Sequence, residues 1–169
     1  MRALVLGLLL MLPARAQKID IQSDGTVDFS RFRTFAIREG RLNSKNPELN
    51  SELVRKRLDA DVRKALEAKG LEFVTSGRPD LNVHYTLGAV KRTQVERYPA
   101  GWRGLGTRVV RVPYTEGSLV IDLRDPSTHE LVWRAIARED KGDASKIEGK
   151  LDDMVKKSFQ KYPPPRPKD

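Results

Sequence analysis

An alternation of apolar and polar residues recurs three times in this chain of 169 residues, and no other feature constrains the fold as strongly. Between residues 81 and 89 every second residue is apolar or aromatic, and residues 119–123 and 131–137 repeat the pattern. Successive side chains of a strand point to opposite faces, so each segment predicts a strand with one apolar face. The turn residues at 125–128 predict that the last two of these strands form a hairpin.

Two shorter strands are predicted before these. Residues 18–22 alternate Ile19 and Ile21 with polar residues, and residues 34–37 follow after a break at Asp24-Gly25. The turn chemistry between them predicts a first hairpin, with Phe29 and Phe32 packed at its base.

Two helices are predicted by apolar stripes at helical spacing. The first begins at Asn46-Pro47-Glu48 and ends at Gly70, a typical left-handed cap. The second begins at Ser145, where Glu148 completes a capping box, and ends before Pro163. The stripes consist of Leu49, Val54, Leu58, Val62, Ala65 and Leu66 in the first helix, and Ile147, Leu151, Met154, Val155, Phe159 and Tyr162 in the second.

The order of these elements predicts one α+β domain over residues 17–162, an antiparallel sheet with two helices packed on one face in a two-layer sandwich. Residues 163–169 form a Pro-rich C-terminal tail.

Residues 1–16 read as a cleavable signal peptide. A positive start at Arg2 precedes a run of apolar residues, and Ala14-Arg15-Ala16 forms a cleavage site before Gln17. The run is too short to cross a membrane, which takes about 20 apolar residues. Cleavage between Ala16 and Gln17 lowers the length from 169 to 153 residues and the net charge from +9 to +7. The sequence therefore predicts an exported, soluble periplasmic protein without a transmembrane segment in its mature chain.

The chain has no cysteine and two histidines, so thiol catalysis, iron–sulfur clusters and disulfides are excluded. We expect neither a metal nor a cofactor, because the histidines and carboxylates lack the spacing of known ligand sets. No catalytic residue is predicted. The alternative is an envelope hydrolase with a carboxylate and histidine site formed by Asp80, His84 and Asp122, and Ser118 as nucleophile.

Positive charge is concentrated in residues 91–114, which contain six basic residues and one acidic residue. We expect an irregular, Gly-rich aromatic loop at its centre. Cations interleaved with aromatic rings are typical of nucleic-acid-binding surfaces. An exported protein meets anionic lipid headgroups, lipopolysaccharide or peptidoglycan, or another envelope protein, rather than nucleic acid. A solvated loop without a partner is the equally weighted alternative. The candidate binding residues are Arg97, Tyr98, Trp102, Arg103, Arg108 and Arg111.

Several motifs in order resemble the domain of unknown function 4136 family. They include the segment from Asp28 to Ala36, Asn46-Pro47, Lys69-Gly70, and the segments 79–85, 116–123, 131–134 and 162–164. The resemblance spans the mature chain and implies an exported α+β protein of Gram-negative envelopes with no established catalytic activity. Many such proteins are lipoproteins, but this chain lacks the cysteine that lipid attachment requires. We therefore predict a non-enzymatic binding or scaffolding module.

Overall fold

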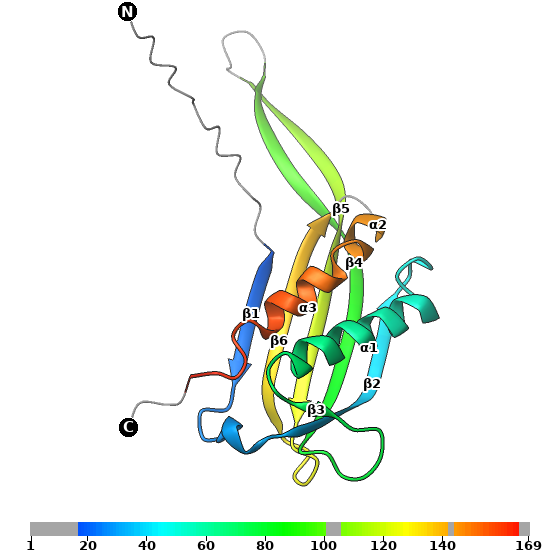
Figure 1. Cartoon of the computed structure of the whole chain (residues 1–169). Helices are drawn as coiled ribbons and strands as arrows, with labels where there is room; N and C mark the ends of the chain where they lie inside the picture. The colour runs from blue at the N-terminus through cyan, green and yellow to red at the C-terminus, as the bar shows by residue number, and fades with distance from the viewer. Residues whose placement is uncertain (1–16, 101–105, 142–143, 166–169) are drawn as a thin grey trace, which may run out of the picture.

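The computed structural model describes residues 17–100, 106–141 and 144–165. In this part of the chain six strands form one mixed sheet in the order β1-β6-β5-β4-β2-β3. Figure 1 shows them with three helices, an α+β fold as predicted. The strands are β1 (Lys18–Ser23), β2 (Thr34–Ser44), β3 (Glu72–Phe73), β4 (Leu81–Ala100), β5 (Gly106–Arg124) and β6 (Leu131–Lys141).

Two predictions about the sheet were wrong. The sheet is not purely antiparallel, because β2 runs parallel to both β3 and β4. Nor do the first two strands form a hairpin: β1 pairs with β6, and β2 lies on the other side of the sheet. The connection carries a short 3-10 turn, η1 (Phe29–Arg31), whose first N–H groups are capped by Asp28. Alternation specifies which face of a strand is buried but not which strand lies beside it, so it could not predict this crossing.

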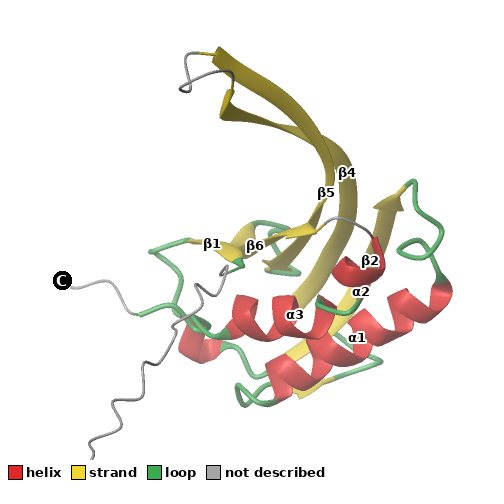
Figure 2. Ribbon diagram, turned by 90° about the horizontal axis from the view of Figure 1, so that it is seen from above, coloured by secondary structure: helices red, strands yellow, loops and turns green. Residues whose placement is uncertain are grey.

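Helices α1 (Glu52–Glu67) and α3 (Leu151–Phe159) lie over the same face of the sheet (Figures 1 and 2). Helix α1 begins later than predicted, because Ser51 is its N-cap and Asn46 instead holds a turn by accepting the Glu48 N–H. Gly70 has the positive φ of 87° that a left-handed cap requires. The predicted last helix is divided into α2 (Ala144–Glu148) and α3 at Gly149-Lys150.

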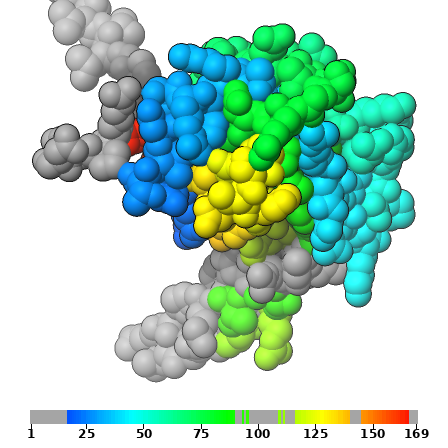
Figure 3. All heavy atoms as spheres, turned by 90° about the horizontal axis from the view of Figure 1, so that it is seen from below, coloured from blue at the N-terminus to red at the C-terminus, as the bar shows by residue number. Residues whose placement is uncertain are grey.

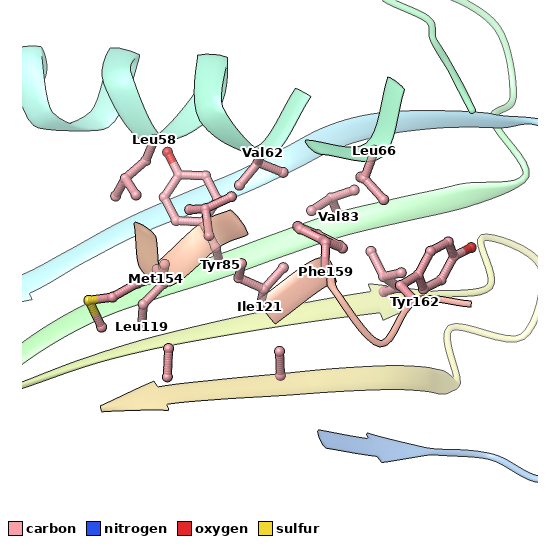
Figure 4. Close-up of a cluster of buried hydrophobic side chains, with 14 of the residues drawn as sticks. Leu58, Val62, Leu66, Val83, Tyr85, Leu119, Ile121, Met154, Phe159 and Tyr162 are labelled. Carbon is pink, nitrogen blue, oxygen red and sulfur yellow. The ribbon is translucent and has the colours of Figure 1, made fainter. Parts of the chain in front are cut away.

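The core lies between these helices and the sheet. Figure 4 shows side chains of α1 and α3 facing the apolar residues of β4 and β5. Trp133 of β6 is fully buried and stacks on Phe159 with ring centroids 5.2 Å apart. Burying apolar surface of this kind is the main favourable term in folding.

Strands β4 and β5 are far longer than their neighbours. Their pairing continues from Asn82↔Arg124 out to Ala100↔Gly106. Residues 91–114, whose centre we expected to be an irregular loop, therefore form a β-hairpin out to Ala100↔Gly106, and residues 101–105 lie outside the described chain. We call residues 91–114 the arm. It curves away from the helices (Figure 2), and its described atoms project beyond the body when seen from below (Figure 3).

Candidate binding surface

The arm is a two-stranded ribbon for most of its length. Strand β2 accompanies β4 only as far as Ser44↔Ala89, and β6 accompanies β5 only as far as Lys141↔Thr115. Beyond these pairs, no other described strand lies beside residues 92–100 and 106–114. Nine residues of a strand extend for about 30 Å. The arm therefore holds its side chains well away from the body of the domain.

The structure places four of the six predicted binding residues along this ribbon. Arg111 is exposed on β5 opposite Val95, which is 46% exposed. Arg97 on β4 pairs with Val109, which is 52% exposed, and Tyr98 pairs with Arg108. The side chains of Arg97, Tyr98 and Arg108 lie outside the described part of the structure. Trp102 and Arg103 lie entirely outside the described part of the structure. Of the predicted cleavage site, Ala16 also lies outside it, and Gln17 is the first described residue.

The composition of the arm makes it a cationic ribbon. Its six cations and one anion give it a charge of +5, most of the +7 predicted for the mature chain. Two exposed valines, Val95 and Val109, add apolar surface on the same ribbon. Isolated two-stranded hairpins are marginally stable in water, so contact with a partner would stabilise the ribbon. Cations combined with apolar side chains suit a surface that is anionic and partly apolar.

The residues of the alternative hydrolase site each have a separate structural role. Asp80 accepts hydrogen bonds from the backbone N–H groups of Arg33 and Thr34, both at 2.9 Å, and from the Thr34 hydroxyl. These hydrogen bonds hold the pKa of Asp80 below its ordinary value of 3.8, and the bond from the Arg33 N–H has the largest effect. The side chain therefore ties the start of β4 to β2.

Asp122 and His84 lie on the sheet face opposite the helices, in one row across the strands. Asp122 is 9% exposed and accepts two hydrogen bonds from Arg134, at 2.6 and 2.7 Å. His84 pairs with Asp122 in the ladder, but its Nδ1 lies 3.5 Å from Glu39 on β2. Ser118 lies four residues from Asp122 along β5, about 13 Å at the rise of a strand. The structure therefore places His84 and Asp122 side by side in the ladder but does not bring the predicted nucleophile, Ser118, to them.

A groove of about 480 Å³ between α1 and α3 was not predicted from the sequence. Its apolar lining includes Ala65 and Phe159, and Lys64 and Lys156 line it as well. Asp61 also lines the groove, where burial raises its pKa and its Oδ2 has no hydrogen-bond partner. The sequence feature that could have indicated this groove is Asp61, an acidic residue among the apolar positions of the first helix.

The described residues contain no group of three or more His, Asp or Glu side chains that could hold a metal ion. None of the helices in this part of the chain has the length and apolar character to span a membrane.

Comparison with known proteins identifies a family and a fold. The family model of the domain of unknown function DUF4136 matches residues 18–164, which confirms the resemblance drawn from the motifs. No curated protein matches the chain.

Solved structures with a similar fold include a PDZ domain protein and PelC. A PDZ domain protein from Parabacteroides distasonis is 18% identical with a TM-score of 0.57 over 89% of this chain, which spans only 36% of that protein. PelC from Paraburkholderia phytofirmans, solved as a dodecamer, is 12% identical with a TM-score of 0.50, covering 85% of this chain and 95% of that one.

Proposed function

We propose that this chain, which belongs to the DUF4136 family of domains of unknown function, is a non-enzymatic binding module of the cell envelope. Its contact element is the arm, and its partner is a surface that carries phosphate groups, as anionic lipids and lipopolysaccharide do. The observation that carries this proposal is the hairpin itself, which extends past every neighbouring strand and has a charge of +5.

The exported location is part of the proposal and rests on residues 1–16, where a short apolar run precedes Ala14-Arg15-Ala16. Sequencing the N-terminus of the protein recovered from the periplasm tests it. We expect the chain to begin at Gln17, and a retained Met1 would contradict export by this route.

The separate engagement of Asp80, His84 and Asp122 supports a binding role over a hydrolytic one. Asp122 accepts hydrogen bonds from Arg134, and Asp80 accepts them from backbone N–H groups, so both carboxylates have structural partners. A catalytic set needs its nucleophile and base within hydrogen-bond reach of one another.

Binding to vesicles tests the proposed contact. The purified protein is mixed with phosphatidylglycerol vesicles, phosphatidylcholine vesicles, lipopolysaccharide and peptidoglycan. We expect binding to the phosphate-rich anionic surfaces, none to neutral vesicles, and weakening as salt rises, because added ions screen exposed charges. Replacing Arg97, Arg103 and Arg108 with glutamine should reduce binding at least about ten-fold, since basic residues near an anionic membrane contribute about 1 kcal/mol each.

The matched control removes the same charge from the body. Lys45, Lys56 and Lys150 are exposed and lie outside the arm. Replacing them with glutamine changes the net charge equally and should leave most of the binding intact. Equal losses in the two triple variants would show that total charge, and not the arm, determines the interaction. Preferential binding to peptidoglycan would contradict phosphate recognition and would indicate that the arm recognises carboxylate groups.

A further inference from the structure

The two edges of the sheet differ in how well they are protected from pairing with another strand. On one side, β3 covers the start of β2, a bulge interrupts β2 between Ile37 and Glu39, and Arg38 and Arg41 are exposed. Bulges and charged side chains are devices that protect sheet edges. On the other side, β1 pairs with β6 in an unbroken register, and no described strand covers its outer edge (Figure 1). Strand β1 is therefore the less protected edge.

The backbone groups that β1 presents outward follow from its pairing with β6. The Asp24 N–H donates to the Val132 carbonyl at 3.0 Å, which continues the register of β1 on β6. In antiparallel pairs, residues that bond to the neighbouring strand alternate with residues whose groups point away. Counting back from Asp24, the N–H and C=O groups of Ile19, Ile21 and Ser23 point toward the open edge. These groups can form a second ladder.

We propose that β1 pairs antiparallel with β1 of a second copy of this chain, with the two-fold axis at Ile21. In this register Ile21 lies opposite Ile21 of the second copy, and Ile19 lies opposite its Ser23. Every outward-pointing N–H or C=O group of Ile19, Ile21 and Ser23 therefore has a partner in the other strand. Lys18 lies opposite Asp24 of the second copy, on both sides of the axis. A register centred on Asp20 instead places two aspartates opposite each other, which is destabilising.

The surroundings of Asp24 favour a lysine there. Asp24 lines a hollow of about 250 Å³ beside β1, together with Asp28 and the C-terminal Pro163–Pro165. The two aspartates are the only charged residues among those that line it. Hydrogen bonds from Thr26 hold the pKa of Asp24 below its ordinary value, so its carboxylate is charged at neutral pH. The positive Lys18 of a second copy complements this acidic end of the strand.

The side chains of β1 also fit pairing with an identical strand. Ile19 and Ile21 are half-buried and pack against the edge of the core. A second copy would cover their remaining exposed surface and join the two sheets into one. A contact of one strand on each side is small, so we expect a dimer that dissociates on dilution. This inference does not depend on the arm or on its ligand.

Sedimentation of the protein, purified after expression of the full chain, tests the proposal over a wide concentration range. We expect a monomer–dimer equilibrium for the wild type. Lys18→Asp places two carboxylates opposite each other at each end of the interface, and Asp24→Lys places two ammonium groups there. Each variant alone should therefore dissociate about ten-fold more readily. Mixing the two variants restores opposite charges across the interface and should restore the dimer, as should the double variant.

A proline variant tests the backbone ladder separately. Ser23→Pro removes an outward N–H without removing a bond to β6, and edge strands tolerate proline at such positions. We expect this variant to be monomeric, with the same circular dichroism spectrum as the wild type. A wild type that stays monomeric at every concentration overturns the proposal. So does a dimer that Ser23→Pro leaves intact, or a mixture of the charge variants that stays monomeric while both are folded.

Discussion

Tyr85 crosses from β4 toward α1 through space that Gly40 leaves open on β2. Its hydroxyl donates to Asp59 at 2.6 Å, and a Cβ added at Gly40 would lie 2.3 Å from the Tyr85 ring. Gly40→Ala should therefore lower the free energy of unfolding by about 1–3 kcal/mol, the usual cost of overpacking. Urea unfolding measures this. Gly25→Ala is the matched control, because nothing lies within 4 Å of its added Cβ, and an equal loss there would rule out the Tyr85 contact as the cause.

Asp80 should make stability depend on pH in the acidic range. Its pKa is lowered in the folded protein, so the stability it contributes is present above about pH 4 and is lost as the pH falls through its folded value. Asp80→Asn should unfold more easily at pH 7 and lose less stability than the wild type on acidification to about pH 2. Thermal unfolding across this range measures both effects. Parallel pH profiles for the two proteins would contradict the role of the carboxylate.

Single residues differed in how well the sequence predicted them. Gly70 was predicted as a left-handed cap and has positive φ, because few other residues accept that conformation. Asp61 and its groove were missed, because they depend on how closely α1 and α3 approach. A cap depends on the residue at one position and can be predicted from the sequence, whereas a groove forms only when two elements pack together.

At the scale of elements, the sequence predicted the positions of strands better than their partners. The segments at 18–22 and 81–89 are strands, but β1 lies beside β6 and not β2. The two-residue β3 was missed, since it is too short for any periodicity to appear. The centre of the arm was predicted to be a loop because its glycines and prolines interrupt the apolar pattern.

The arm should be removable without unfolding the domain. The described core ends at Ala89 on β4 and resumes at Leu119 on β5. Arg92 and Tyr114 are paired, so an Asn-Gly turn can join them in place of residues 93–113. We expect the free energy of unfolding to change by less than about 1 kcal/mol and binding to anionic vesicles to be lost. A shortened protein that fails to fold would show that the arm is part of the fold.

At the scale of the whole molecule, the charge of the mature domain is unevenly distributed. The arm has +5 of the predicted +7, whereas on the body many charges are paired, as Arg134 is with Asp122 and Arg138 with Asp20. A body close to neutral with one cationic projection suits a protein that meets its partner at the end of the arm. The sequence predicted the charge of this segment, and the structure added that it is held away from the domain.

Crosslinking in intact cells tests the central proposal, that the arm is the binding element, most directly. A photoreactive residue is placed at Val95 or Val109 on the arm, or at Leu53 on α1 as a control, since all three side chains are exposed and apolar. We predict that the arm positions capture lipid or lipopolysaccharide, identified by mass spectrometry, and that Leu53 does not. Equal capture from Leu53, or none from either arm position, would contradict the proposal.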